Sequence, residues 1–154
     1  MSQQETKATI LLADDEEDSR FAFQIGLEMN GYEVLISRNG DEVLEQLSAA
    51  RTDARKIDLV ITDLQMPGMT GRELIERVLA FENTPPILVI SGFQDESLAE
   101  ELVRQGCRGY LNKPFTISIL TEWIERTLIE IQENSASDAA RNGGESERAT
   151  NDSC

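Results

Sequence analysis

ILLADD, at residues 10–15, is a short apolar run that ends in two aspartates. The same change from apolar to polar residues occurs in IDLVITD at 57–63, ILVIS at 87–91 and YLNKP at 110–114. Short apolar runs between longer amphipathic segments are typical of buried parallel strands. The carboxyl ends of parallel strands meet at one edge of the sheet, where open α/β folds place their ligand sites. The sequence therefore predicts that five polar side chains gather at this edge: Asp14, Asp15, Asp63, Ser91 and Lys113.

Strands and helices are expected to alternate along the whole domain. We expect strands near residues 8–13, 32–37, 57–62, 87–91 and 108–111, and helices near 17–30, 41–50, 71–81, 95–105 and 116–132. Successive strand–helix units with right-handed crossovers form a doubly wound parallel sheet between two helical layers. The predicted fold class is α/β, a five-stranded, three-layer sandwich.

The composition predicts one acidic domain and a polar tail. The chain has 154 residues and a net charge of −15. The expected domain covers residues 1–132, with its core at about 7–132, and residues 133–154 are expected to be a disordered tail. The segment from Asn134 to Cys154 has no leucine, isoleucine, valine or aromatic residue. Its burial would therefore not offset its loss of conformational entropy.

The composition also disfavours several functional classes. A net negative charge opposes direct binding of nucleic acid. No apolar run approaches the roughly 18–20 residues that span a bilayer, and the N-terminus is not a signal peptide, so we expect a cytoplasmic protein without a membrane partner. The chain has no histidine, which removes histidine general bases, most zinc sites and any phosphohistidine within this chain.

The predicted edge of the sheet has the side chains of a site that binds a divalent metal and handles a phosphoryl group. Adjacent buried carboxylates such as Asp14 and Asp15 repel each other, and a hard cation such as Mg²⁺ relieves this repulsion. In isolation the pair also fits an acid-rich helix start, but Asp63 adds a third carboxylate. A carboxylate beside Mg²⁺ can act as a nucleophile and form an acyl phosphate. Lys113 would neutralise one phosphoryl oxygen, and Ser91 and the backbone at Gly92 would donate hydrogen bonds.

These motifs together resemble the receiver domain of bacterial two-component response regulators, including the single-domain chemotaxis type. The resemblance covers about residues 7–132 and rests on Asp14-Asp15, Asp63-Leu64-Gln65-Met66-Pro67-Gly68, Ser91-Gly92 and Lys113-Pro114-Phe115. It implies the flavodoxin-like strand order 2-1-3-4-5.

The resemblance also implies a role for each site residue. Asp63 would be the phosphoacceptor that becomes a 4-aspartylphosphate. Mg²⁺ would be bound by Asp15, Asp63 and the backbone carbonyl of Gln65, with Asp14 completing the metal site through water. Ser91, Gly92 and Lys113 would hold the phosphoryl group, Tyr110 would be the aromatic switch, and the Lys113–Pro114 peptide bond would be cis. Gln65 and Ser91 depart from residues that are frequent in the family, and Gln65 and Phe93 lie where they would affect the lifetime of the phosphorylated state.

The implied function is a signalling switch in a phosphorelay. A histidine kinase or histidine phosphotransfer protein would donate the phosphoryl group. The helical spacing of the small residues Ser19, Ala22 and Gly26 leads us to expect that the first helix docks this donor, together with the loop around Pro114-Phe115. The phosphorylated form would change its contacts with a downstream protein or with a second copy of itself. The chain would not be an enzyme acting on a separate substrate, because phosphotransfer and dephosphorylation are self-catalysed. It would be either a single-domain regulator or the receiver portion of a larger protein.

Three other readings remain as alternatives. A haloacid-dehalogenase-type phosphatase also uses an aspartyl phosphate, Mg²⁺ and a lysine, but its general acid would occupy the position of Gln65. An interaction scaffold with a degenerate pocket is disfavoured by the complete set of acids and Lys113. A flavodoxin is disfavoured because the acid-rich turn after residue 13 would repel a phosphate.

Overall fold

The computed structural model describes residues 6–53, 55–66, 68–92 and 95–133. The chain divides into two compact units, Met1–Thr121 and Glu122–Cys154. The expected disordered tail and the residues Pro67 and Phe93 lie outside the described residues, apart from residue 133. No described helix is both long enough and apolar enough to cross a membrane.

The first unit contains a parallel sheet with the strand order β2-β1-β3-β4-β5. With the helices that alternate with its strands, this sheet has the flavodoxin-like α/β fold, as predicted. The elements in chain order are β1 (Thr9–Ala13), α1 (Glu17–Met29), β2 (Glu33–Ser37), α2 (Gly40–Thr52), β3 (Leu59–Asp63), α3 (Gly71–Leu79), β4 (Ile87–Ser91), α4 (Glu96–Gln105) and β5 (Gly109–Asn112). A last helix occupies residues 117–133 and begins within this unit.

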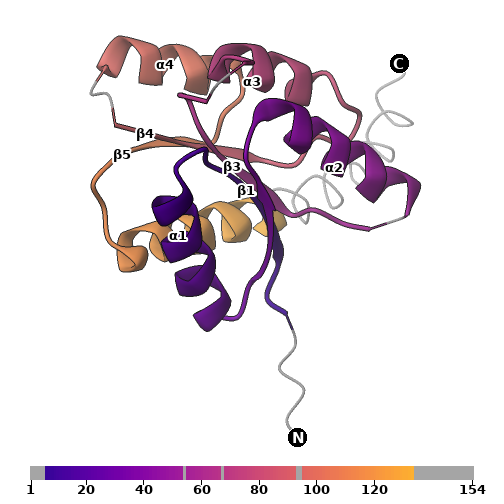
Figure 1. The fold of residues 1–154 in the computed structure, drawn as a ribbon, viewed down its shortest axis with the longest axis vertical. Coiled ribbons are helices and arrows are strands. Elements are labelled where there is room, and N and C mark those ends of the chain that lie inside the picture. The colour runs from indigo at the N-terminus through magenta and orange to yellow at the C-terminus, as the bar shows by residue number, and fades with distance from the viewer. Residues whose placement is uncertain (1–5, 54, 67, 93–94, 134–154) are drawn as a thin grey trace, which may run out of the picture. The chain divides into compact units, whose positions relative to one another are not determined.

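The two faces of the sheet are covered by different helices. In Figure 1, α1 lies on one face, and α2, α3 and α4 lie on the other. Every residue of β3 and β4 is buried, which explains their continuous apolar sequences, because both faces of a central parallel strand are covered. The core on the side of α2, α3 and α4 consists of Leu11, Ala13, Val43, Leu47, Val60, Met66, Leu74, Ile75, Val78, Ile87, Val89, Leu102 and Cys107.

The helix starts differ in a way that bears on the site. Four of the described helices have a side-chain N-cap: Asn39 accepts from the N–H of Glu42, Thr70 from that of Glu73, Asp95 from that of Leu98, and Thr116 from that of Ile119. Such caps satisfy backbone donors that have no partner within the helix. The start of α1, at residue 17, has no side-chain cap. Asp14 and Asp15, which precede this helix, lie at the carboxyl edge of the sheet instead.

Several predicted boundaries differ from the structure by one or two residues; the third helix, for example, was expected to end at residue 81, but α3 ends at Leu79. Two of these differences have a visible physical cause. We expected the third strand to begin at residue 57, but β3 begins at Leu59. The Asp58 carboxylate accepts the N–H of Thr9 at 2.8 Å, so a side chain takes this donor before the strand ladder begins. We also expected the second helix to end at residue 50, but α2 continues to Thr52. No proline or glycine interrupts the segment that follows, and the Thr52 hydroxyl donates to the carbonyl of Ser48 within the last turn.

Candidate functional site

Three carboxylates meet where β1 and β3 end. Asp14 directly follows β1, and Asp63 is the last residue of the neighbouring strand β3. Asp14, Asp15 and Asp63 each offer one carboxylate oxygen, and these oxygens lie within 4.8 Å of one another. Asp14 and Asp63 are buried, and Asp15 is exposed. The side chains that the sequence predicted to meet at the edge of the sheet therefore include a compact acidic group.

Lys113 bonds to two of these carboxylates. It follows β5, and its backbone N–H donates to the carbonyl of Ser91 at 2.7 Å. Its Nζ lies 2.7 Å from Asp63 Oδ2 and 3.3 Å from Asp14 Oδ2. The peptide bond between Lys113 and Pro114 is cis. Lys113 is thus placed as a counter-charge within the acidic group, although its segment is 50 residues from Asp63 in the sequence.

Backbone donors hold the other oxygens of the two buried aspartates. The N–H of Glu16 donates to Asp14 Oδ1, and the N–H of Gln65 donates to Asp63 Oδ1, both at 3.0 Å. Each aspartate therefore bonds the residue two positions later, a local arrangement that suits a tight turn after a strand. Both carboxylates have a fixed orientation before any ligand binds.

Burial, hydrogen bonds and neighbouring charges together determine the pKa values of the group. Burial raises the pKa of Asp14 above its usual value, and the negative charge of Asp63 raises it further, against the opposing effects of the Glu16 N–H and Lys113. Burial by itself lowers the pKa of Lys113, but its hydrogen bonds and ion pairs with Asp63 and Asp14 outweigh this effect. The pKa of Lys113 is therefore raised, and the lysine is charged at neutral pH.

The donor set fits a hard divalent cation. Three carboxylates and one ammonium group leave two formal negative charges, since minus three plus one is minus two. Mg²⁺ prefers oxygen ligands, keeps several waters and binds proteins through few carboxylates. The exposed side chain of Asp15 leaves one side of the group open to a hydrated ion. The acidic group is therefore of the type that holds Mg²⁺.

Ser91, Gly92 and Gln65 lie at or just beyond the same edge of the sheet, and Tyr110 lies two residues before the end of β5. Ser91 is fully buried at the end of β4, beside Asn112 of β5. Gly92 is exposed, and a Cβ at this position would meet nothing within 4 Å. Gln65 is exposed, and Tyr110 is half-buried against the core on the side of α2, α3 and α4. These positions are compatible with the expected roles in phosphoryl binding, metal binding and switching, which stay predictions.

Two features of α1 were not foreseen from the sequence. Arg20 donates from Nη1 to the backbone carbonyl of Asp14 at 2.9 Å. Phe23 stacks on Phe115, with ring centroids 5.2 Å apart and an interplanar angle of 9°. No local pattern distinguishes Arg20 from a solvated arginine, and the two rings are too far apart in the sequence for their contact to be read from spacing.

Comparison with known proteins agrees with this geometry. The family model of the response regulator receiver domain matches residues 10–125. The match includes both strand ends that supply the acids, as well as Ser91 and Lys113. The chain therefore belongs to the response regulator receiver domain family, whose members act in two-component signalling.

The chain is similar to several relatives and solved structures of this family. The chain is 33% identical over 121 residues to the transcriptional regulatory protein FixJ of Rhizobium meliloti, covering 79% of this chain and 57% of FixJ. A receiver domain structure from Clostridium thermocellum is 27% identical with a TM-score of 0.71, covering 81% of this chain and 97% of that one. The chemotaxis regulator CheY4 of Vibrio cholerae is 31% identical with a TM-score of 0.67, covering 79% and 98%.

The curated relatives are longer than the region they share with this chain. The chain spans 57% of FixJ, 25% of the dicarboxylate transport regulator DctD of the same organism and 45% of a transcriptional regulator from Picosynechococcus. Similarity to these proteins therefore concerns the shared region and not the rest of their length.

Proposed function

We propose that this protein is a phosphorylation-dependent switch in which Asp63 accepts a phosphoryl group from a phosphohistidine of a partner. The observation that carries this proposal is the 2.7 Å contact between Asp63 Oδ2 and Lys113 Nζ within a group of three carboxylates. A buried nucleophile beside a fixed ammonium group and a cation site has what transfer of a phosphoryl group requires.

The transfer involves one bond formed and one bond broken. A carboxylate oxygen of Asp63 attacks the phosphorus, and the new O–P bond forms while the N–P bond of the phosphohistidine breaks. The electron pair of that bond leaves with the imidazole nitrogen, and Asp63 becomes an acyl phosphate. Because charge spreads over the three equatorial oxygens, catalysis consists of positioning and neutralisation. Lys113 neutralises one oxygen, and Ser91 and the backbone at Gly92 donate to the others.

Mg²⁺ would be held by Asp15, Asp63 and the backbone carbonyl of Gln65, with Asp14 completing the site through water. When bound, Mg²⁺ supplies the positive charge that allows an anionic phosphoryl group to approach a group of carboxylates. The chain's own contribution is to fix Asp14 and Asp63 through the N–H groups of Glu16 and Gln65. These bonds reduce the reorganisation that the reaction requires.

The exposed face of α1 is the docking surface we propose for the phosphodonor. Phe21, Ile25 and Met29 are 62%, 41% and 82% exposed and recur every four residues, so they form one stripe, the α1 stripe. This surface differs from the expected small-residue stripe of Ser19, Ala22 and Gly26, because Gly26 is only half-exposed and the side chain of Ile117 packs close to it.

The surroundings of the α1 stripe indicate the chemistry of the donor. A hollow of about 360 Å³ beside it is lined by Glu17, Asp18, Arg20, Phe21, Gln24 and Ile36. The acids of the first turn are exposed. A histidine kinase or histidine phosphotransfer protein that docks here would present a helix with an apolar stripe and basic flanks.

The output is a change in protein–protein contacts. Ser91 lies beside Asn112, two residues along β5 from Tyr110. We propose that movement of Ser91 toward the phosphoryl group shifts Tyr110, which alters the surface read by a downstream protein or by a second copy of this chain. A preference of that partner for the phosphorylated form of about 1–3 kcal/mol is sufficient for such a switch. If the chain is the receiver portion of a larger protein, the same surface controls the attached domain.

Incubation with acetyl phosphate and Mg²⁺, followed by intact mass measurement, tests the phosphoacceptor. We expect one added phosphoryl group on the wild-type chain and none on Asp63→Asn. Labelling of Asp63→Asn to the wild-type extent would overturn the assignment.

Partner docking is tested separately with two variants. Ile25→Arg should block transfer from a cognate phosphohistidine protein while leaving labelling by acetyl phosphate intact. Val103→Arg is the matched control, since Val103 of α4 is 48% exposed and lies outside the α1 stripe. Equal loss of partner transfer in both variants would place the docking surface elsewhere.

A further inference from the structure

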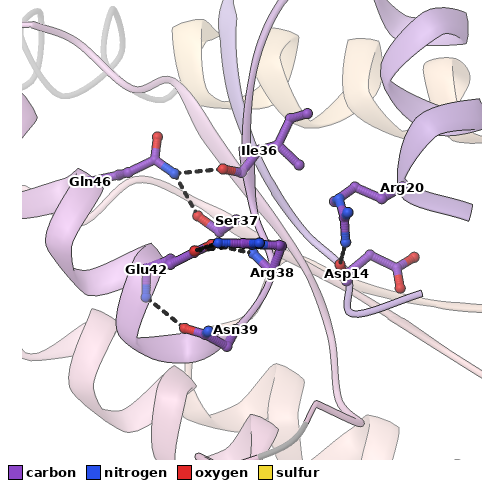
Figure 2. Close-up of polar contacts among 8 residues, drawn as sticks. All are labelled: Asp14, Arg20, Ile36, Ser37, Arg38, Asn39, Glu42 and Gln46. Carbon is purple, nitrogen blue, oxygen red and sulfur yellow. Dashed lines mark hydrogen bonds and ion pairs between the residues drawn. The ribbon is translucent and has the colours of Figure 1, made fainter. Parts of the chain in front are cut away.

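Arg20 reaches from α1 to the backbone of the acidic group. Its Nη1 donates a hydrogen bond of 2.9 Å to the carbonyl oxygen of Asp14, and Figure 2 shows the guanidinium group directed at this oxygen. The carbonyl belongs to the peptide group that joins Asp14 to Asp15. Because a peptide group is planar and rigid, this bond fixes the orientation of the whole plane that precedes Asp15.

The peptide plane that follows Asp15 is fixed as well. The N–H of Glu16 donates to Asp14 Oδ1 at 3.0 Å. Two backbone dihedral angles of Asp15 relate these two planes, so fixing both planes also fixes the direction of its Cα–Cβ bond, from which the carboxylate extends. Asp15 lies beyond β1 and is exposed, and the strand ladder does not hold it. Its orientation therefore depends on these two hydrogen bonds.

Asp14 has anchors that do not involve Arg20. Its N–H donates to the carbonyl of Ser37, at the end of β2, at 3.2 Å. The side-chain amide of Gln46, from α2, donates to the Ser37 hydroxyl and to the Ile36 carbonyl at 2.7 Å each, as Figure 2 shows. Loss of Arg20 would therefore free the Asp14 carbonyl while Asp14 itself stays attached to the sheet.

We propose that Arg20 is a positioning residue for the Mg²⁺ site, which holds Asp15 where its carboxylate joins those of Asp14 and Asp63. This inference rests on the proposed function, in which Asp15 is a Mg²⁺ ligand. A guanidinium group near a cation site repels the cation. Charge alone therefore predicts tighter Mg²⁺ binding when Arg20 is replaced, whereas the positioning role predicts weaker binding.

A pair of arginine variants distinguishes weaker Mg²⁺ binding from tighter Mg²⁺ binding. Arg20→Met removes the donor and the charge but keeps a long side chain. Its Mg²⁺ dissociation constant, measured by amide NMR titration without phosphodonor, should rise about 10-fold, as for other residues that orient metal ligands. Arg38→Met is the matched control, because Arg38 is exposed and pairs with Glu42 at 3.0 Å, as Figure 2 also shows. Its affinity should equal that of the wild type or be slightly tighter.

Two further measurements distinguish positioning from general structural damage. In the metal-free protein, Arg20→Met should shift the resonances of the Asp14 carbonyl carbon and the Asp15 amide, and Arg38→Met should not. At saturating Mg²⁺, the rate of labelling by acetyl phosphate should return close to the wild-type rate. Arg20→Lys keeps the positive charge but replaces the planar guanidinium group with an ammonium group. It should bind Mg²⁺ with an affinity between those of the wild type and Arg20→Met. It also serves as the test variant if Arg20→Met does not fold.

The positioning role would be overturned if Arg20→Met bound Mg²⁺ as tightly as Arg38→Met does. The same holds for Arg20→Lys if it is used in place of Arg20→Met. Failure of the wild-type protein to show Mg²⁺-dependent labelling would overturn the proposed function instead, so the two failures are distinguishable.

Discussion

The carboxyl ends of β1 and β3 present their aspartates in the same local arrangement. In each, Oδ1 accepts the N–H of the residue two positions later, Glu16 for Asp14 and Gln65 for Asp63, at 3.0 Å. In each, Oδ2 accepts from Lys113 Nζ, at 3.3 Å for Asp14 and 2.7 Å for Asp63. Two carboxylates with the same kinds of donor are therefore distinguished by their surroundings.

The surroundings of the two strand ends differ in burial and in neighbouring charge. Asp14 is 0% exposed and Asp63 is 5% exposed, and burial raises the pKa of Asp14. Asp14 is followed by a second acid, Asp15, whereas Asp63 is followed by Leu64. The β1 end gathers negative charge for a cation, and the β3 end offers a less enclosed oxygen close to an ammonium group. This difference supports Asp63 as the nucleophile and Asp14 as its support.

Replacing the lysine that both ends share should have the largest effect. Lys113→Met removes the charge that would neutralise the transferring group, so labelling of Asp63 by acetyl phosphate should slow about 100-fold or more. It also leaves two buried carboxylates without their counter-charge, so the free energy of unfolding should fall by about 3 kcal/mol. Urea unfolding and a labelling time course measure the two effects.

Lys56→Met provides the control for this change. Lys56 is exposed and pairs with Asp58 at 3.5 Å, and exposed pairs of this kind contribute little to stability. If Lys113→Met and Lys56→Met have equally small effects on stability and labelling, the lysine has no role at the site.

Replacing the exposed acid tests the β1 end as a cation site. Asp15→Asn keeps the size of the side chain and removes one of the three carboxylates. The Mg²⁺ dissociation constant should rise about 10-fold or more, as expected when a charged ligand becomes neutral. Asp18→Asn is the control, since Asp18 is also exposed but lies in the first turn of α1. Unchanged Mg²⁺ affinity in Asp15→Asn would contradict its role as a ligand.

Burial of the Asp14 carboxylate should lower the stability of the metal-free protein at neutral pH. The pKa of Asp14 in the folded state lies above its ordinary value of 3.8. A carboxyl group with a raised pKa destabilises the fold at a pH above that raised value, and this cost disappears below the unfolded pKa. Asp14→Asn should therefore raise the free energy of unfolding at neutral pH, and the gain should vanish as the pH falls below about 3.8. A stability gain that persists at low pH would exclude ionisation of Asp14 as its cause.

The smallest expected effect concerns the ring pair that connects α1 with the segment after Lys113. Stacked aromatic pairs contribute about 0.5–1.5 kcal/mol beyond the area they bury. Phe23→Leu should therefore lower the free energy of unfolding by about 1 kcal/mol, because it loses the stack on Phe115. Phe21→Leu is the control, since Phe21 is 62% exposed and should change stability little. Equal effects of the two substitutions would show that the stack adds nothing.

The sequence predicted the parts of the structure that depend on local pattern. Apolar runs ending in polar residues located β1, β3, β4 and β5, and parallel pairing then brings their ends together. The start of β3 was wrong because the contact between the Asp58 side chain and Thr9 joins residues 49 apart. The exposure of Phe21 and Met29, and the cover over Gly26, depend on how α1 lies on the sheet, which amphipathic spacing alone does not determine.

Locating the acyl phosphate on the wild-type chain tests directly whether Asp63 is the phosphoacceptor. Labelling with acetyl phosphate and Mg²⁺, followed by borohydride reduction and peptide mass spectrometry, distinguishes the strand ends of β1 and β3. Asp14→Asn and Asp63→Asn form a matched pair, because the two carboxylates have the same kinds of donor. We expect reduction at Asp63 alone in the wild type, retention of that site in Asp14→Asn and no labelled peptide in Asp63→Asn. Reduction at Asp14 or Asp15 in the wild type would contradict this expectation.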